Sequence, residues 1–544
     1  MKIQANLEKT AKYYPEQSFT ANRLKLKDLK HISRTTTDFS RSSSAINSKG
    51  DYAQFIKDFE SKYIDRNKAV WEYMTSNNLW TGLKSYIKIF NYDIFINKKE
   101  NRENYCKLYG QQDIKFENLF VRFANFLKML SNDIFWHRAE KKVLKTKGII
   151  DGKKVSQDEI SKIILNDKNP ELREKACNAK FKIGDSLVNY VTSIVKKRNS
   201  LAQNLKHNSY FDFLLNKNYK TNAEAFNNNL NKTYSALKPK FEKVFEETNN
   251  SLKNIFQTNQ LEHYHYDLRI CSEEYKILDE IVAKYGALSL AKKIYSKMGF
   301  DLDKLINEGK LIFYEDKSKK RAFHKALMPG KLSAICTEQS NNFYNLLTMC
   351  HELGHAMYNL GLSESLPLCM KKSTSIIMNE AIAIMMSNIV LDENMLTDIV
   401  PADILEKVKK NRHQEQLIKL AKFFAITEFE QEMYSNPNQD LAKLWQEKFK
   451  KYTGRNYAAS NEWATFDYFI SSPARVHNYI KATLAADQLH KILKEKLGNF
   501  SDYKEVAKYL NENIFSKGAS LSESELLKEI AGKELSFEDF VENL

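Results

Sequence analysis

Residues 343–360 read FYNLLTMCHELGHAMYNL, and this stretch decides how we interpret the fold. Apolar side chains recur in it at the spacing of one helix face, at positions 343, 346, 347, 350, 353 and 357. The stretch contains no proline, and Gly361 follows it at the place where a helix commonly ends. The sequence therefore predicts one continuous helix, buried along one side, over residues 343–360.

The same helix carries the pattern His351-Glu352-Leu353-Gly354-His355. Two histidines one turn apart project from the same helix face, so both imidazoles can reach a single zinc ion. The glutamate between them is placed to polarise a water molecule bound to that ion. Chance would produce this pattern only about 0.01 times in a chain with 11 histidines. A pair of histidines without metal is therefore the weaker interpretation.

A zinc ion that acts in catalysis needs a third protein ligand, and Glu380 is the candidate. It lies in residues 374–391, TSIIMNEAIAIMMSNIVL, which are apolar nearly all round and therefore predict a buried helix. An unpaired carboxylate in such a helix would cost several kcal/mol, so a cation must lie near it. That cation is either the zinc ion of His351 and His355 or a lysine or arginine in a structural salt bridge.

Glycine and proline are scarce, with 16 and 8 among 544 residues, and this scarcity predicts long helices. It excludes collagen-like and proline-rich disordered chains and disfavours an all-β fold, which needs many turn residues. Helical spacing of apolar residues also runs through 171–199, after Pro170 in a first-turn position. One segment differs, because residues 311–314, 321–324 and 331–336 predict a small β-ribbon that borders the 343–360 helix.

The chain carries 84 Lys and Arg against 68 Asp and Glu, a net charge of +16. These charges are spread along the sequence beside residues of opposite sign, which favours a solvated surface over a nucleic-acid or membrane site. A polyanion-binding protein is an alternative that rests on the charge alone. There is no apolar run of a signal peptide or of a membrane helix, and the 6 cysteines show no CxxC spacing. We therefore expect a cytoplasmic protein with reduced thiols, and export that needs no cleavable signal stays open.

HELGH followed by the helix with Asn379-Glu380-Ala381 resembles the Glu-ligand zinc peptidases (gluzincins), the group of oligoendopeptidase F, thimet oligopeptidase and angiotensin-converting enzyme. Residues 198–204 and 210–213 resemble the N-terminal half of these families, and residues 518–529 resemble their C-terminal segment. The resemblance covers roughly residues 160–544. It implies a metalloprotease with one zinc ion at the HExxH pattern and the downstream glutamate.

The resemblance also implies a mainly α fold, in which two helical halves enclose a deep cleft with the zinc ion on its floor. Residues 51–544 would form this single domain, with approximate, interleaved halves 51–300 and 301–544, after an N-terminal extension and Ser/Thr-rich linker at 1–50. Such clefts admit extended oligopeptides, and the β-ribbon would offer the peptide an edge strand. His324 lies where the converting-enzyme pattern has a substrate-contacting histidine.

In this group the zinc ion lowers the pKa of a bound water, and a glutamate at the position of Glu352 takes its proton and later passes it to the leaving amine. A histidine and a tyrosine from a late segment stabilise the oxyanion. Here that segment has Tyr468 at the histidine position and His477 at a tyrosine position. We expect His477 and Tyr479 to be the catalytic donors. Tyr468 is expected to bind substrate and is the next candidate for a donor. Simple packing of these rings is the alternative.

Two further departures from the family pattern concern specificity and the zinc histidines. Asp467 stands near the place of a lysine that binds the substrate's C-terminal carboxylate in the converting-enzyme pattern, so we predict endo-acting cleavage instead of dipeptide release. A position that is often acidic in that pattern is Ile384 here. Each zinc histidine still needs an acceptor for its second ring nitrogen. The candidates are Ser373, Ser375 and Asn379.

The sequence thus predicts zinc-dependent, endo-acting hydrolysis of peptide bonds in extended oligopeptides, through a zinc-bound water that Glu352 activates. The alternative is a catalytically inactive protein that binds a peptide or a partner on the same fold. We expect neither nucleic acid nor a membrane as partner, and the sequence leaves the oligomeric state open.

Overall fold

The computed structural model describes residues 49–75, 142–219, 221–270, 273–315, 322–337, 341–372, 374–392, 394–497 and 504–532. The N-terminal extension predicted for 1–50 lies outside these ranges except for its last residues, 49 and 50. Helices dominate the described residues, which confirms the predicted mainly α fold. None of the helices in these ranges is long and apolar enough to cross a membrane.

The α-helices are α3 (Lys49–Thr75), α7 (Gln157–Asn166), α8 (Pro170–Asn204), α9 (Tyr210–Tyr219), α10 (Ala223–Phe256), α11 (Glu273–Tyr285), α12 (Ala287–Lys297), α13 (Leu302–Asn307), α14 (Phe343–Leu360), α15 (Leu368–Lys372), α16 (Ile376–Ile389), α17 (Ala402–Ser435), α18 (Leu441–Thr453), α19 (Tyr468–Ser471), α20 (Val476–Lys496), α21 (Glu505–Asn513) and α22 (Glu523–Ala531). Short 3₁₀ turns are η1 (His263–His265), η2 (Asn461–Thr465) and η3 (Phe515–Lys517).

Local sequence signals begin the helices that matter for the site. Pro170 takes the first position of α8, as predicted. The side chain of Asn342 caps α14, whose bounds coincide with the predicted helix over 343–360. Ser375 caps α16, the predicted apolar helix that carries Glu380. The start of each of these helices is therefore encoded next to the helix itself.

The predicted β-ribbon is a three-stranded sheet of β3 (Leu311–Glu315), β4 (Phe323–Met328) and β5 (Leu332–Thr337). β5 lies in the centre, parallel to β3 and antiparallel to β4. The chain turns from β4 into β5 at Gly330, which has a φ of +78°. The second strand thus begins later than the predicted 321–324 and runs up to this turn. β4 and β5 pack against α14, and β1 (Gly148–Ile150) pairs separately with β2 (Lys153–Val155).

Helix α3 covers the end of β4, which no sequence pattern predicted. Asn67 donates a hydrogen bond to the carbonyl oxygen of Leu327 at 2.8 Å. Phe59 and Tyr63 of the same helix are buried in one apolar cluster with Leu327 and Met328. A peptide that pairs with the edge of β4 could therefore reach only the first part of this strand.

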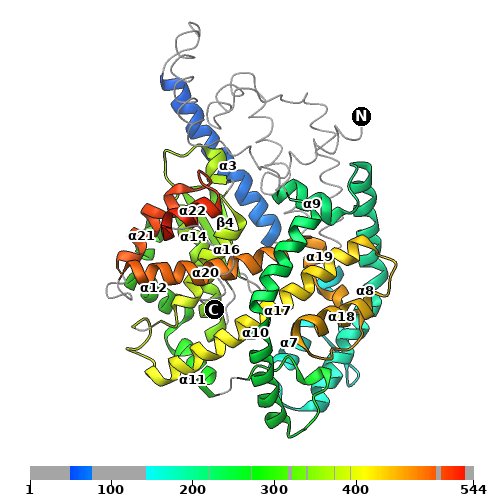
Figure 1. Cartoon of the computed structure of the whole chain (residues 1–544). Coiled ribbons are helices and arrows are strands. Elements are labelled where there is room, and N and C mark those ends of the chain that lie inside the picture. The colour runs from blue at the N-terminus through cyan, green and yellow to red at the C-terminus, as the bar shows by residue number, and fades with distance from the viewer. Residues whose placement is uncertain are drawn as a thin grey trace.

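Two groups of helices lie side by side in Figure 1, and α17 runs across both. In one group α8 packs against α7, α9 and η2, whereas in the other α14 packs against α16, and α16 against α20. α17 contacts α10 and α18 in the first group and α11 and α20 in the second. Because α18, η2 and α19 come late in the chain but pack with the first group, the two groups are interleaved in sequence.

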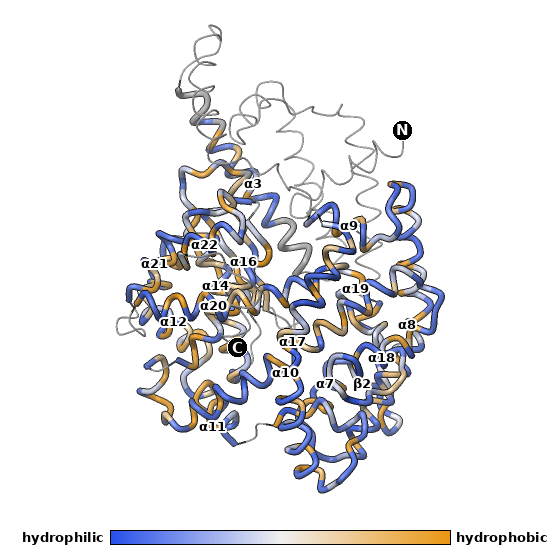
Figure 2. The backbone as a smooth tube through the Cα atoms, in the orientation of Figure 1, coloured by the Kyte–Doolittle hydropathy of each residue, from blue (hydrophilic) through white to orange (hydrophobic). Residues whose placement is uncertain are grey.

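The distribution of apolar residues places α16 in the interior. Figure 2 shows hydrophilic and hydrophobic residues alternating along outer helices such as α8 and α10, as expected for helices with one buried face. α16 instead lies between α14 and α20, which are its main contacts. Its buried residues are Ile377, Met378, Ala381, Ile382, Ala383, Met385, Met386 and Ile389.

α14 and α16 approach each other closely at Gly354, the glycine of the HELGH pattern. A Cβ atom at this position would lie 2.9 Å from the Cα of Ala383 and 3.2 Å from the Cβ of Met386. These distances are shorter than the separation of about 3.5–4.0 Å at which carbon atoms attract. The missing side chain of Gly354 therefore sets the distance between the two helices.

Replacing Gly354 with alanine should lower the free energy of unfolding by about 1–3 kcal/mol, because the added methyl group forces α14 and α16 apart. A purely local effect would have the opposite sign, since alanine favours a helix by about 0.5–1 kcal/mol over glycine. Urea denaturation followed by circular dichroism measures the change. A variant at least as stable as the wild type would contradict the close contact.

Candidate active site

The three predicted metal ligands come together where α14 meets α16. His351 and His355 project from α14 one turn apart, and Glu380 faces them from α16. The Nε2 atoms of His351 and His355 lie 3.6 Å and 3.9 Å from Oε2 of Glu380. The candidate ligand atoms all lie within 4.8 Å of one another, and no second such group of histidine, cysteine and acidic residues occurs in the part of the chain that the structure describes.

These distances fit a single zinc ion. Two ligand atoms that each lie about 2.1 Å from a tetrahedral zinc ion are about 3.4 Å apart, which is close to both separations from Glu380. Two imidazole nitrogens and one carboxylate oxygen are also a donor set typical of catalytic zinc. The alternative of a structural salt bridge finds no support, because no lysine or arginine of the described ranges forms an ion pair with Glu380.

Asn379 orients one of the two histidines. The Nδ1 atom of His355 lies 3.0 Å from Oδ1 of Asn379, so the N–H group on Nδ1 donates and Nε2 is left for the metal side. Of the other candidates for this acceptor, Ser373 lies outside the described residues. The hydroxyl of Ser375 instead accepts a hydrogen bond from the backbone N–H of Met378 at the start of α16.

Glu352 points a buried carboxyl group at the same place. Burial raises the pKa of Glu352 to about 7, and the neighbouring Glu380 carboxylate also raises it. His355 and a hydrogen bond from the backbone N–H of His324 act in the opposite direction. A carboxyl group with a pKa near neutrality can both accept and release a proton, as a general base and acid must.

His324 of β4 lies beside these histidines. Its ring stacks on that of His355 with the centroids 5.9 Å apart, and its Nε2 atom is 3.1 Å from Oγ of Ser333. Burial lowers the pKa of His324 well below its ordinary value, with His355 and Lys325 adding to the effect. The ring is therefore neutral at pH 7. Its contact with a substrate stays a prediction, since one ring nitrogen already faces Ser333.

Tyr468 and Tyr479 lie on the Glu380 side of the site. Their hydroxyl oxygens are 3.4 Å apart. Burial raises the pKa of Tyr479, and the nearby Glu380 carboxylate and the Tyr468 hydroxyl raise it further. Tyr479 therefore keeps its proton at neutral pH and can donate a hydrogen bond.

His477 is not brought to this site. Its ring packs edge-on against Tyr219 and Phe226, with centroids 4.8 Å and 5.0 Å away, and only 4% of its surface is exposed. Burial lowers the pKa of His477 to about 3. His477 and Tyr479 are two residues apart on α20, so they project from nearly opposite sides of the helix. The structure thus places Tyr479, but not His477, beside Tyr468, and the donor role of Tyr479 stays a prediction. His477 lies in a packed position, which was the alternative for this ring.

Arg198 holds the segment that carries Tyr468, a role that its place in the sequence does not predict. Its guanidinium donates to the carbonyl oxygens of Phe469 and Ile470, at 2.6 Å each, and to the hydroxyl of Tyr434 at 3.0 Å. These bonds tie α8 to α19, whose residues are more than two hundred positions later in the chain. Arg198 belongs to residues 198–204, on which the family resemblance partly rests. This resemblance is the sequence feature that could have pointed to Arg198.

Glu430 of α17 holds the end of the same segment. Its carboxyl group accepts a hydrogen bond of 2.8 Å from the backbone N–H of Ala474, which has an unusual φ of +54° for a residue with a side chain. The turn before α20 is thus fixed from two sides, by α8 through Arg198 and by α17 through Glu430. Because this turn determines where α20 begins, it also determines the position of Tyr479.

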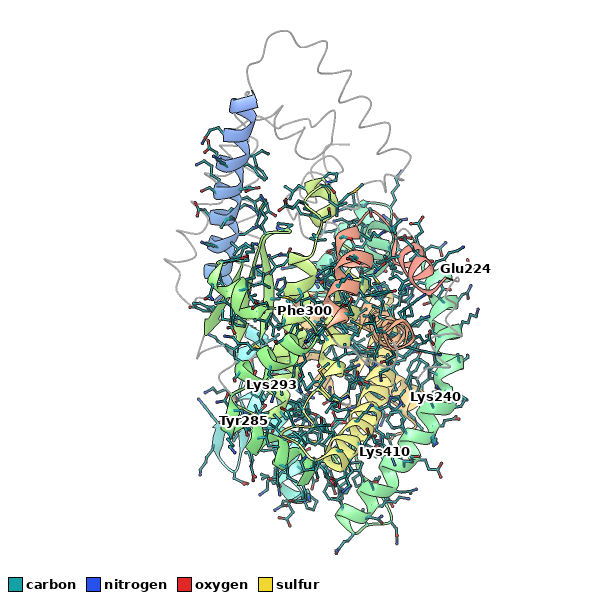
Figure 3. All side chains as sticks on the ribbon, turned by 90° about the vertical axis from the view of Figure 1, so that its left-hand side faces the viewer. Glu224, Lys240, Tyr285, Lys293, Phe300 and Lys410 are labelled. Carbon is teal, nitrogen blue, oxygen red and sulfur yellow. The ribbon has the colours of Figure 1, made fainter. Side chains whose placement is uncertain are left out.

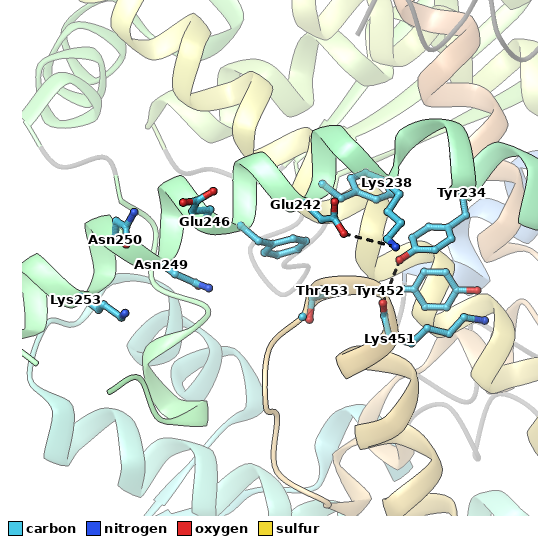
Figure 4. A pocket seen from close by; sticks show the side chains of 13 residues that line it. Tyr234, Lys238, Glu242, Glu246, Asn249, Asn250, Lys253, Lys451, Tyr452 and Thr453 are labelled. Atoms are coloured by element: carbon cyan, nitrogen blue, oxygen red, sulfur yellow. Dashed lines mark hydrogen bonds and ion pairs between the residues drawn. The ribbon is translucent and has the colours of Figure 1, made fainter. Parts of the chain in front are cut away.

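A surface groove lies between α10 and the end of α18 (Figure 4). Within it the hydroxyl of Tyr234 donates to the carbonyl oxygen of Lys451, and Lys238 pairs with Glu242. None of the predicted site residues lines this groove. It is therefore separate from the candidate active site.

Comparisons with known proteins agree with this geometry. The sequence profile described as "Peptidase family M3" matches residues 163–298 and 300–544, more than half of the chain. No curated protein matches the sequence. Among solved structures, an oligoendopeptidase F is similar over 99% of this chain and 94% of its own, with a TM-score of 0.59 and 14% identity. A PZ peptidase A with an inhibitor is similar over 100% and 95%, with a TM-score of 0.60 and 15% identity. These two structures show the fold.

Glu430 should make the stability of the protein depend on pH. Burial raises the pKa of Glu430 to about 8, against the opposing effects of the Ala474 N–H and Arg198, whereas the pKa of an unfolded glutamate is about 4.3. The folded protein thus binds more protons between these values, so the free energy of unfolding falls as the pH rises from about 5 to about 8. Glu430→Gln keeps an acceptor for Ala474 and should remove this part of the slope.

Chemical denaturation across this pH range measures the effect for the wild type and the variant. Glu406→Gln, at an exposed position of the same helix, is the matched control and should keep the wild-type slope. Equal slopes for Glu430→Gln and the wild type would contradict the buried, protonated carboxyl group.

Proposed function

The chain belongs to peptidase family M3, and on this premise we propose that it hydrolyses peptide bonds within oligopeptides at a zinc ion held by His351, His355 and Glu380. The observation that carries the proposal is the convergence of these metal-binding atoms from two packed helices beside the buried carboxyl group of Glu352. A family of peptidases supplies the reaction class, and the residues supply the means to perform it.

A zinc ion bound here would polarise the carbonyl group of a peptide bond and lower the pKa of a water molecule from about 16 towards 7. The protein's part is to hold the ligand atoms in place beforehand. His355 is fixed by Asn379, and Glu380 is fixed by the apolar packing of α16 between two neighbouring helices. Such fixed ligands need little rearrangement when a metal binds.

Glu352 would act as the general base and then as the general acid. Its carboxylate would accept a proton from the attacking water and later deliver that proton to the nitrogen of the leaving amine. Burial raises the pKa of Glu352 in the described site, whereas a zinc ion bound beside it would lower that pKa and favour the carboxylate form that accepts the proton.

Tyr479 is our candidate donor to the oxyanion that forms on the substrate carbonyl, and Tyr468 supports it. The two hydroxyls lie next to each other on the Glu380 side, 3.4 Å apart. A donor of this kind is worth about 10²- to 10³-fold in rate. His477 is left out of the proposed donor set, because its ring is packed between Tyr219 and Phe226.

The substrate would lie in an extended conformation beside β4. This strand is at the edge of its sheet and packs against the helix with the HELGH pattern, and an extended peptide can add to such an edge. The first residues of β4, near His324, are the ones proposed to pair with it, since Asn67 already binds the carbonyl oxygen of Leu327.

Endo-acting cleavage agrees with the name given to one structural relative, which is described as an oligoendopeptidase F. Asp467 has only 7% of its surface exposed, and repulsion of a substrate carboxylate by Asp467 is not part of the proposal.

Glu352→Gln should bind one zinc ion per chain, as the wild type does, but should cleave an internally quenched fluorescent peptide about 10²- to 10⁴-fold more slowly, because the general base is lost. Elemental analysis of the dialysed proteins measures the zinc. A chelator should abolish wild-type cleavage, and added zinc should restore it.

Glu406→Gln is the control for this experiment and should keep wild-type turnover. Peptides blocked at both ends test the endo mode, since an enzyme that needs a free terminus leaves them intact. If the zinc-loaded wild type cleaves no peptide of a diverse set and Glu352→Gln behaves identically, the protein is a binding scaffold and not an enzyme.

A further inference from the structure

A lysine and an aromatic ring of α17 approach the proposed donor tyrosine. The Nζ atom of Lys419 lies 5.5 Å from the ring centroid of Phe423, one turn later on the helix. The Phe423 ring in turn lies 5.5 Å from the ring of Tyr479. The side chain of Lys419 is exposed to solvent. Lys419 therefore presents an accessible positive charge near the Tyr479 side of the site.

A second cation approaches the same place from α20. Arg475 directly precedes this helix, one turn before Tyr479, so the two side chains share a helix face. Arg475 therefore lies beside the candidate oxyanion donor, at the start of the helix that packs on α16.

Neither cation is neutralised by a carboxylate of the described residues. No ion pair within 4.0 Å joins Lys419 or Arg475 to an acidic side chain there. Glu415, which lies near Lys419, is already engaged by Arg412 at 2.7 Å and by the Tyr344 hydroxyl at 2.9 Å. Three other lysines of α17 do have acidic partners, and these are Lys407, Lys409 and Lys422.

We infer that Lys419 and Arg475 form a cationic subsite that binds a carboxylate group of the substrate peptide beside Tyr479. This inference rests on the proposed function. The guanidinium of Arg475 can bind both oxygens of a carboxylate, and the ammonium of Lys419 adds a flexible point charge. The carboxylate is either the side chain of an aspartate or glutamate near the cleaved bond or the C-terminus of the peptide.

Matched peptides separate these two sources. The first pair is blocked at both ends and carries glutamate or glutamine, placed in turn at each position around the cleaved bond. The second pair has a neutral sequence and ends in a free carboxylate or in an amide. For one of these positions, or for the C-terminus, the wild type should cleave the peptide that carries the carboxylate with a kcat/KM about five- to tenfold higher than that of its neutral partner. The difference should come mainly from a lower KM.

The variants test which residues cause the preference. Lys419→Met with Arg475→Gln should bring the ratio of the two kcat/KM values close to one, and Lys419→Glu should favour the neutral peptide. Lys410→Met is the matched control, because Lys410 lies at an exposed position of α17 (Figure 3), more than two helical turns before Lys419, and it should keep the wild-type ratio.

A zinc-loaded Glu352→Gln protein measures the same preference as a difference in peptide affinity, by fluorescence anisotropy, without turnover. Absence of any cleavage by the wild type would thus defeat the proposed function and leave the subsite measurable. Equal affinity and equal kcat/KM for both members of both pairs would overturn the subsite, as would a preference that survives in the double variant.

Discussion

The contact between α14 and α16 at Gly354 is the constraint on which the rest of the site depends. The Cα of Ala383 lies where it would meet a Cβ atom at 2.9 Å, so only glycine allows this approach. The approach places Glu380 within 4 Å of two imidazoles, inside a region that is otherwise apolar. A buried carboxylate is stabilised by a cation beside it, and a metal ion held by the same two imidazoles would be such a cation. The packing of the two helices therefore also creates the candidate metal site.

A second set of contacts brings distant parts of the chain to this centre. α20 also packs on α16, and it carries Tyr479. The turn before α20 is held by Arg198 of α8 and by Glu430 of α17, through backbone groups of residues 469–474. Helices of both groups in Figure 1 thus fix the turn that precedes Tyr479.

The sequence predicts those parts of the site that depend on one short segment. It does not predict which way a helix turns its side chains or how the strands are ordered in the sheet. The bounds of α14, the apolar character of α16 and the convergence on Glu380 follow from spacing within short segments. His477, which the sequence paired with Tyr479 as a donor, packs against Tyr219 and Phe226 instead, because positions two residues apart on α20 face nearly opposite sides of the helix. The central place of β5 and the cover of β4 by α3 arise from contacts between segments that are far apart, which spacing does not encode.

X-ray absorption at the zinc K-edge of the zinc-loaded protein tests the central claim most directly. The account predicts two imidazole nitrogens and one carboxylate oxygen at about 2.0–2.2 Å, one further oxygen from water, and no sulfur. A sulfur neighbour at about 2.3 Å, as the adjacent Cys350 could supply, or a shell of oxygens without imidazole would contradict a zinc ion held by His351, His355 and Glu380.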